Sequence, residues 1–301
     1  MSLRAELVRL GLRAFVKRDS PTIAAARASL GVAAALVPAP PAGTEVSKID
    51  AFGVPADLIA TPASRPDHHV LYLHGGGYVS GSPALYRNFT WRVAAAARAR
   101  VLVVDYRLAP EHPFPAALED ALAACRWLVA GGADPRRTAV MGDSAGGGLA
   151  LALLLRLRDG GLERPAAAVV LSPWTDLALT GASLARNARR DPMLTLANTA
   201  RFAASYLAGA DPRHPYASPL YGDPAGLPPT LIHAASDEIM SDDAVRMAEN
   251  MQRAGCRVEL QVWPRVPHVW HLFAPVLPEA NAALGRIAVF IDAAFTGAHT
   301  R

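Results

Sequence analysis

The chain has 301 residues, of which 51% are hydrophobic and 19% are charged, so it can bury a large core and shows no compositional sign of disorder. Its net charge of +4 comes from 30 basic and 26 acidic residues, and the basic residues are spread along the sequence. Because nucleic-acid binding requires basic residues clustered on one face, this distribution argues against a nucleic-acid partner.

The N-terminal segment has the pattern of an amphipathic helix. Leu3, Leu7, Leu10 and Ala14 recur at helical spacing, with charged residues between them, so the segment lacks the apolar run of a signal peptide. A basic amphipathic helix can lie on a membrane surface, but we expect this one to pack on its own protein, without stable membrane anchoring.

The cysteine content favours a reducing compartment. Cys125 and Cys256 are the only two cysteines, and each lies in an apolar, periodic stretch. Two buried thiols are therefore expected rather than a disulfide, and the expected location is the cytoplasm.

The next segments define the expected domain organisation. A second helical stretch, residues 22–36, precedes a proline-rich passage at 37–43 that cannot continue a helix. We therefore expect an N-terminal helical cap segment at residues 1–43 and a catalytic domain at 44–301.

Short apolar runs alternate with longer periodic stretches through the rest of the chain. The expected strands are 70–73, 101–104, 138–141, 167–171, 230–234 and 258–262, and the expected helices are 86–98, 116–129, 146–158, 242–254 and 278–294. This rhythm predicts an α/β fold with a mostly parallel central sheet covered by helices on both faces. Residues 181–215 break the rhythm, so we expect a cap insertion at about 181–215.

A nucleophile motif follows the third expected strand. Gly142-Asp-Ser-Ala-Gly146 joins the strand 138–141 to a long apolar helix, which is the context of a nucleophile elbow with Ser144 at its tip. The tight turn leaves little room around the serine, so glycines are needed two residues before and two residues after it. At a helix N-terminus, backbone amides also favour developing negative charge.

A second motif, His74-Gly-Gly-Gly77, comes directly after the first expected strand. Three consecutive glycines leave the backbone unobstructed, so their amides can face a substrate oxygen. We expect His74 to orient this loop rather than act as a base.

The acid of a serine hydrolase triad follows the nucleophile in the chain, and the histidine follows the acid. Asp237 stands just beyond the strand 230–234 and is the acid that we choose, with Glu238, Asp242 and Asp243 as competitors. The last two are expected to cap the next helix.

The base is expected after the strand 258–262. His268 lies in the loop that follows this strand, and we choose it as the base. His271 falls where the chain begins to turn helical, so a packing or surface role is expected for it.

With these motifs in place, the sequence resembles the hormone-sensitive-lipase family of α/β-hydrolases, in its bacterial branch with HGGG and GDSAGG motifs. Three further segments carry the resemblance: the passage 105–120 (DYRLAPEHPFPAALED), Ser172-Pro-Trp-Thr-Asp176, and Asp237-Glu-Ile-Met-Ser-Asp-Asp243. The likeness covers the chain from about Val70 to Phe273. One departure is His268-Val-Trp, where many members have His-Gly-Phe.

The resemblance implies an α/β-hydrolase fold and a serine carboxylic ester hydrolase that forms an acyl-enzyme. It implies a triad of Ser144, Asp237 and His268, with no metal and no organic cofactor. The implied oxyanion hole consists of the amides of Gly76, Gly77 and Ala145. The N-terminal helices and the insertion are implied to form a cap over the substrate.

The expected substrate is a short- to medium-chain acyl ester, because the cleft is expected to be apolar but bounded. The residues expected to line it are Tyr78, Trp174, Met193, Trp270 and Phe273. Asp143 is expected either to border the alcohol side of the site or to hydrogen-bond a loop.

Two alternative functions stay open. A lactone hydrolase or an amidase would use the same triad, since fold and triad do not name a substrate. A ligand-binding protein on the same fold is the remote alternative, and the presence of His268 argues against it. The oligomeric state is also open, with a homodimer among the options.

Overall fold

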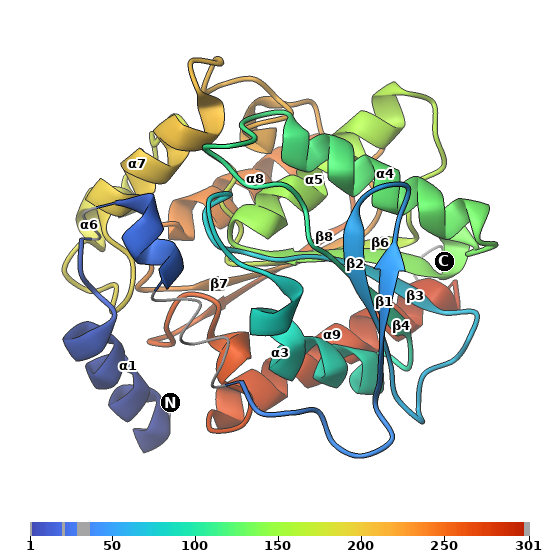
Figure 1. The fold of residues 1–301 in the computed structure, drawn as a ribbon. Helices are drawn as coiled ribbons and strands as arrows, with labels where there is room; N and C mark the ends of the chain where they lie inside the picture. Colours follow the sequence, from blue (N-terminus) through green and yellow to red (C-terminus); the bar gives the residue numbers. More distant parts are fainter. Residues whose placement is uncertain (1, 20–21, 29–36, 298–301) are drawn as a thin grey trace.

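In the computed structural model, which describes residues 2–19, 22–28 and 37–297, the described strands form one eight-stranded sheet (Figure 1). The strands are β1 (Glu45–Asp50), β2 (Pro55–Ala60), β3 (His69–Leu73), β4 (Arg100–Val104), β5 (Thr138–Asp143), β6 (Ala167–Leu171), β7 (Thr230–Ala235) and β8 (Val258–Trp263). Their order in the sheet is β1-β2-β4-β3-β5-β6-β7-β8.

The six strands expected from the sequence are confirmed as β3 to β8, and they are parallel. Their central members are buried on both faces, which explains their continuous apolar sequences. Strands β1 and β2, which were not expected from the sequence pattern, add an antiparallel hairpin at one edge. Because β1 is largely exposed, its sequence lacks the apolar run that marks the central strands.

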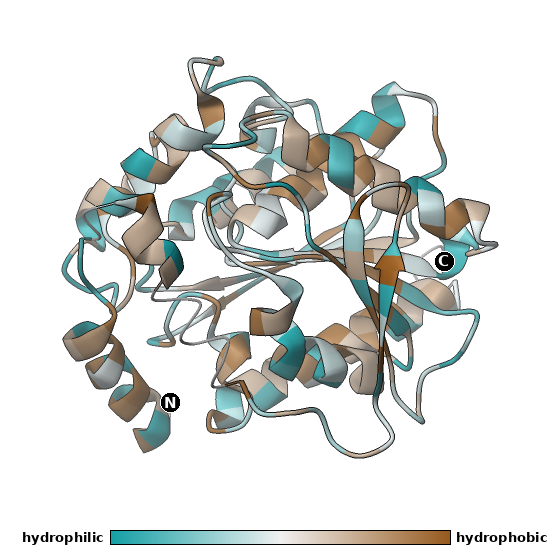
Figure 2. Cartoon of the chain, in the orientation of Figure 1, coloured by the Kyte–Doolittle hydropathy of each residue, from teal (hydrophilic) through white to brown (hydrophobic). Residues whose placement is uncertain are grey.

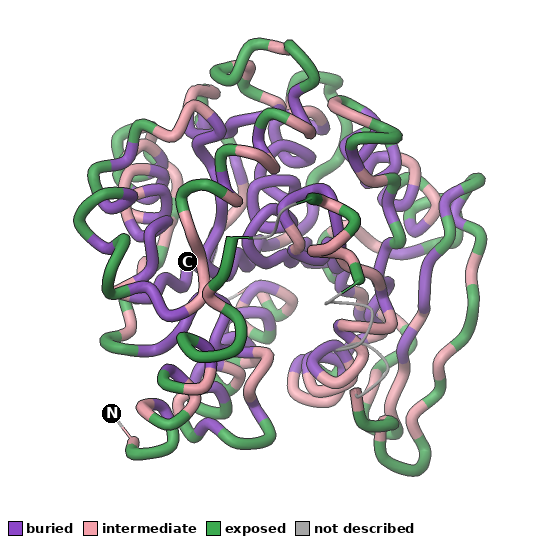
Figure 3. The backbone as a smooth tube through the Cα atoms, turned by 60° about the vertical axis from the view of Figure 1, so that its left-hand side comes forward, coloured by how far each residue is buried: buried purple, intermediate pink, exposed green. Residues whose placement is uncertain are grey.

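Helices cover both faces of the sheet. On one face lie α4 (Ala116–Ala130), α5 (Ala145–Asp159) and α8 (Ser241–Arg253), and on the other lie α3 (Pro83–Ala96) and α9 (Pro278–Phe295) (Figure 1). All five agree with the expected helices to within three residues at each end. Buried residues concentrate around the sheet, with exposed residues at the periphery (Figure 3). This architecture is the α/β-hydrolase fold.

The remaining helices gather at one side of the molecule. They are α1 (Leu3–Phe15), α6 (Ser183–Arg186) and α7 (Leu196–Leu207) (Figure 1). Short 3-10 turns elsewhere in the fold are η1 (Pro135–Arg137), η2 (Pro219–Tyr221) and η3 (Trp270–Phe273). Of the second helix expected at 22–36, residues 23–28 are helical, whereas 29–36 lie outside the described residues.

Cys125 is buried and Cys256 is half-buried, and both are free thiols, so the expected burial is complete for only one of them. Within the part of the chain that the structure describes, no helix combines the length and the apolar character needed to span a bilayer.

The interior helix α5 gives a direct test of the core. Leu153 on α5 is completely buried, so Leu153→Ala should lower the free energy of unfolding by about 2–5 kcal/mol, because it leaves a cavity between helix and sheet. Val289 on α9 is 70% exposed, and Val289→Ala should change it by less than about 0.5 kcal/mol. Urea unfolding of both variants measures the difference, and equal effects would contradict this placement of α5.

Candidate active site

The serine sits on a strained turn between β5 and α5. Ser144 has a φ of 52° and a ψ of −122°, a conformation that residues other than glycine rarely adopt. A Cβ atom on Gly142 would collide with the carbonyl of Gly146, and one on Gly146 would collide with the carbonyl of Leu73. The two glycines are therefore required by close backbone contacts, as the sequence predicts for an elbow.

The imidazole of His268 joins the serine to a carboxylate. Its Nε2 lies 2.9 Å from Ser144 Oγ, and its Nδ1 lies 2.6 Å from Glu238 Oε2. The other carboxylate oxygen of Glu238 accepts the amide N–H of Ala235 at 2.9 Å. Ser144 is 9% exposed, whereas His268 is 2% and Glu238 is 0% exposed, so the hydroxyl is the member of the relay open to a substrate.

The structure corrects the choice of acid. Asp237 does not face His268; its carboxylate accepts a hydrogen bond from Arg9 of α1 at 2.9 Å. The turn after β7 directs the side chain of Asp237 outward, where it is 17% exposed, and that of Glu238 inward, where it is completely buried. Glu238, named above as a competitor, is thus the carboxylate beside the imidazole.

The environment of His268 favours its protonated form. Burial acts to lower the pKa of His268, but the hydrogen bond and charge of Glu238 outweigh burial, with Asp191 and Asp143 adding to them, so the pKa is raised above its ordinary value of 6.5. A base held this way can take a proton from Ser144 and remain stable as an imidazolium.

The triple-glycine loop turns two of its carbonyls inward. Gly75 O faces His74 Nδ1 at 2.8 Å, and Gly76 O accepts the hydroxyl of Ser80 at 2.7 Å. Because C=O and N–H point in opposite directions across a trans peptide, the amides of Gly76 and Gly77 point away from the interior of the loop. These are the orientations that an oxyanion hole needs. The pKa of His74 is lowered to about 4 by burial, which fits an orienting role.

Asp143 anchors this loop beneath the serine. Its carboxylate accepts the hydroxyls of Tyr72 at 2.6 Å and Tyr86 at 2.9 Å, and the amide of Gly75 at 3.0 Å. Burial raises the pKa of Asp143 to about 6, against these hydrogen bonds. Of the two roles left open for Asp143, the structure supports the loop hydrogen bond and not a place in the substrate pocket. No pattern in the sequence indicates its two tyrosine partners.

Three other residues expected to line the pocket are buried among other side chains. Tyr78 stacks on Tyr206 with ring centroids 3.8 Å apart and is 1% exposed. Trp174 is 1% exposed and donates its indole N–H to the backbone of Asp176. Trp270 is completely buried and packs on histidine rings, so its expected role in the pocket is wrong.

Met193 and Phe273 are both half-buried. Their expected contact with substrate stays a prediction. Phe202 of α7 lies directly against Gly77, although no sequence pattern indicates this contact. A Cβ atom added to Gly77 would be 2.5 Å from the ring of Phe202. An aromatic side chain from the expected cap insertion thus meets the triple-glycine loop.

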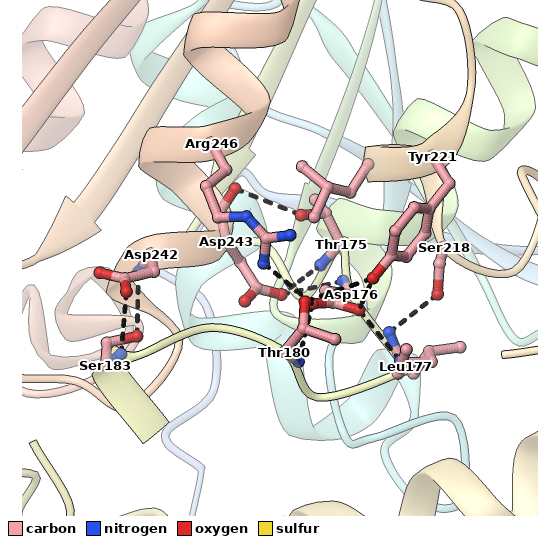
Figure 4. A network of polar contacts seen from close by, with 12 residues as sticks. Thr175, Asp176, Leu177, Thr180, Ser183, Ser218, Tyr221, Asp242, Asp243 and Arg246 are labelled. Carbon is pink, nitrogen blue, oxygen red and sulfur yellow. Dashed lines mark hydrogen bonds and ion pairs between the residues drawn. The ribbon is translucent and has the colours of Figure 1, made fainter. Parts of the chain in front are cut away.

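A buried polar network fastens the loop after β6 to the start of α8 (Figure 4). Asp243 accepts the amides of Thr175 and Asp176, each at 2.9 Å, and Asp176 accepts hydrogen bonds from Tyr221 and Arg246. Burial raises the pKa of Asp243 to about 8. Asp243 lies in the first turn of α8, as expected, but its carboxylate binds a different segment instead of capping its own helix.

Asp242 behaves in the same way. Its carboxylate accepts the amide of Ser183 at 2.9 Å, so it too binds a neighbouring segment rather than capping α8. His271 has the expected packing role: it lies 3.0 Å from His233, and burial holds its pKa well below the ordinary value. Among the described residues, no cluster of three or more His, Cys, Asp or Glu side chains is arranged to hold a metal ion.

A surface depression of about 360 Å³ lies far from these groups. Its lining includes His69, Arg100 and Arg137, which stand at the amino ends of β3, β4 and β5. Ser144 and the triple-glycine loop follow the carboxyl ends of β5 and β3. Because reactive groups of such sheets gather at the carboxyl ends, the depression is not part of this site.

Comparison with known proteins identifies the family of the chain. A family model for the alpha/beta hydrolase fold matches residues 70–272. An acetyl-hydrolase of Streptomyces hygroscopicus is 48% identical over 233 residues, covering 77% of this chain and 78% of that protein. An esterase of Acinetobacter venetianus is 34% identical, covering 82% of this chain and 81% of that protein.

Solved structures are also similar to this chain. The crystal structure of an esterase from the bacterial hormone-sensitive lipase family superposes with a TM-score of 0.93 at 43% identity, covering 97% of this chain and 98% of that one. The protein EstE5, in a crystal soaked with p-nitrophenyl butyrate, superposes with a TM-score of 0.93 at 38% identity, covering 98% and 100%. The chain is therefore a carboxylic ester hydrolase that belongs to the hormone-sensitive-lipase family of α/β-hydrolases.

Proposed function

We propose that this enzyme is a serine carboxylesterase for short- to medium-chain acyl esters, working through a triad of Ser144, His268 and Glu238 and a covalent acyl-enzyme. The observation that carries the proposal is the position of His268, with one ring nitrogen 2.9 Å from Ser144 Oγ and the other 2.6 Å from Glu238. A nucleophile, a base and an orienting acid in contact make an activated serine.

In the first step, Ser144 Oγ attacks the ester carbonyl while His268 Nε2 takes the hydroxyl proton. His268 then gives this proton to the departing alcohol, which leaves the acyl group on Ser144. Water, deprotonated by His268, cleaves the acyl-enzyme. Glu238 holds Nδ1 protonated and stabilises the imidazolium through both half-reactions.

The oxyanion that forms in each half-reaction needs donors that are already in place. We assign this role to the amides of Gly76, Gly77 and Ala145. The inward carbonyls of the loop and the position of Ala145 as the first residue of α5 support the assignment. Loss of one such donor typically raises the barrier by about 3–4 kcal/mol.

The N-terminal segment 1–43 and the insertion at about 181–215 are proposed to form the cap. Their described parts contact each other, since Asp19 accepts the hydroxyl of Thr195 at 2.6 Å and Arg18 accepts an amide hydrogen bond from the side chain of Asn198. Together with the ring of Phe202 on Gly77, these contacts favour a bounded substrate space.

Ser144→Ala should abolish hydrolysis of p-nitrophenyl butyrate while leaving the circular dichroism spectrum unchanged, because the reacting oxygen is lost and the backbone is not. A panel of p-nitrophenyl esters, lactones and anilides, with a serine-directed phosphonate as control, measures the activity and separates esterase from lactonase and amidase. Retained turnover in the variant would exclude Ser144 as the nucleophile, and a preference for lactones or anilides would select the alternative activity.

Substitution at the two neighbouring carboxylates distinguishes the acid. Glu238→Gln should lower kcat by about 10⁴-fold, because the amide stabilises the wrong tautomer of His268 and no longer stabilises its charge. Asp237→Asn should lower kcat by less than about tenfold, since Asp237 binds Arg9 and not the imidazole. Steady-state kinetics on p-nitrophenyl butyrate measures both, and the reverse ranking would restore Asp237 as the acid.

The pH profile supplies the control for this pair. His268 must be neutral to accept the proton, so kcat/KM should fall at acid pH with a midpoint above 6.5, following the raised pKa of His268. Removal of the negative charge in Glu238→Gln lowers that pKa, and the midpoint should move to lower pH. Asp237→Asn should leave the midpoint in place.

The acyl preference is proposed to be short because Phe202 occupies the space beside Gly77. Two relatives support this proposal by name: one is an acetyl-hydrolase, and EstE5 was soaked with a butyrate ester. We therefore expect acetate and butyrate esters to be the better substrates.

Phe202→Ala should raise the kcat/KM for p-nitrophenyl octanoate relative to p-nitrophenyl acetate by about tenfold or more, because removal of the ring makes room for added methylenes. Phe52→Ala is the matched control, since Phe52 is 61% exposed in the hairpin turn between β1 and β2. An unchanged ratio in Phe202→Ala, or activity that peaks on long-chain triglyceride emulsions in the unmodified enzyme, would contradict the proposed substrate space.

A further inference from the structure

The helix α1 packs on the protein through the face opposite to the one that its sequence suggests. Leu3, Leu7 and Leu10 are 77%, 60% and 58% exposed, and their spacing aligns them on one side of the helix; we refer to these three residues as the leucine stripe. The inward face is made of Ala5, Arg9 and Leu12. In Figure 2, α1 lies at the edge of the molecule and carries several hydrophobic residues.

Polar contacts fix this orientation along the length of the segment. At its start, Ser2 Oγ donates to Glu279 at 2.9 Å. In the middle, the buried Arg9 binds Asp237 at 2.9 Å, and Arg13 donates to the carbonyl of Arg190 at 2.9 Å. After the helix, Lys17 donates to the carbonyl of Asp191 at 2.7 Å. Since the charged side chains find their partners in the protein, the leucine stripe is left facing outward.

The surroundings of the leucine stripe are basic. Of the basic side chains in residues 2–19, Arg4, Arg13 and Arg18 are exposed and Arg9 is buried, while both acidic side chains of the segment have partners. Glu6 pairs with Arg265, and Asp19 accepts the hydroxyl of Thr195. The adjoining loop adds Arg189 and Arg190, both exposed.

We propose that the leucine stripe docks on an anionic lipid surface. An amphipathic helix lying in the plane of an interface buries its apolar side chains among the acyl chains while basic residues beside them meet the phosphates. A second copy of this chain fits less well, because a twofold contact through the leucine stripe would bring two basic rims together. Docking through one short helix is reversible and differs from stable anchoring.

The position of α1 connects this surface to the reaction centre. Arg9 holds Asp237, which is the sequence neighbour of Glu238, and Lys17 holds the backbone of Asp191, whose side chain accepts the amide of Ile239. An enzyme docked through α1 therefore has the acid-bearing loop and the 188–191 segment close to the lipid.

The test is partition of the full chain onto vesicles of phosphatidylcholine alone or mixed with phosphatidylglycerol. The unmodified enzyme should bind the anionic vesicles, and added salt should weaken the binding. The combined variant Leu3→Gln, Leu7→Gln and Leu10→Gln should bind at least about tenfold more weakly, because it loses the apolar contribution. The matched control is Val129→Gln with Val289→Gln, which changes two exposed residues on α4 and α9 and should bind normally.

Activity, fluorescence and light-scattering measurements distinguish lipid docking from loss of the fold and from dimer formation. Both variants should keep the circular dichroism spectrum and the rate on soluble p-nitrophenyl acetate. The single variant Leu7→Trp should show a blue-shifted emission difference on anionic vesicles, which tests the placement without a change of polarity. Failure of the unmodified enzyme to bind, equal binding by the leucine variant, or no emission shift would overturn the proposal. Light scattering that shows the leucine variant losing a dimer while vesicle binding persists would assign the surface to a second copy instead.

Discussion

The active site depends on one constraint, the positive φ of Ser144 in the turn between β5 and α5. Such a backbone costs on the order of 1–3 kcal/mol and persists only where the surrounding structure fixes it. Here the amide of Ser144 donates to Leu171 of the next strand at 2.8 Å, and Gly142 and Gly146 permit the close approach of the backbone. The strain exposes the hydroxyl at the carboxyl edge of the sheet, where the loops after β3, β7 and β8 can meet it.

Those loops are fixed to one another by buried carboxylates. Asp143 precedes Ser144 and binds the triple-glycine loop, while Asp243 stands in the first turn of the helix that follows Glu238 and binds the loop after β6. Burial alone disfavours both charges, as the raised pKa values show. Backbone amides donate hydrogen bonds to each carboxylate and so offset the cost of its burial. The same hydrogen bonds give buried amides their partners and hold neighbouring loops together.

The sequence predicted what local pattern and close packing determine. The central strands are recognisable because two buried faces require continuous apolar runs, and the elbow because only glycines fit around Ser144. Local pattern could not distinguish Asp237 from Glu238, because it does not show the direction of each side chain in the turn after β7. Asp237 contacts Arg9 of α1, which is distant in the sequence, and Glu238 contacts His268. The hairpin β1–β2 was missed because an exposed edge strand needs few apolar residues. The orientation of α1 was missed because helical spacing shows which residues share a face, not which face meets the protein.

Arg9 takes part in both features that the sequence did not reveal, the partner of Asp237 and the inward face of α1. A buried guanidinium needs acceptors, and Asp237 together with the carbonyl of Arg190 provides them. This pairing places Arg9 on the inward face of α1, beside Ala5 and Leu12, and engages the carboxylate of Asp237. Glu238 follows directly in the chain, and its longer side chain reaches the imidazole from the inner side of the turn. The two consecutive acidic residues thus have different partners, and the ion pair of Arg9 acts with the contacts of Ser2, Arg13 and Lys17 to set which face of the N-terminal helix meets solvent.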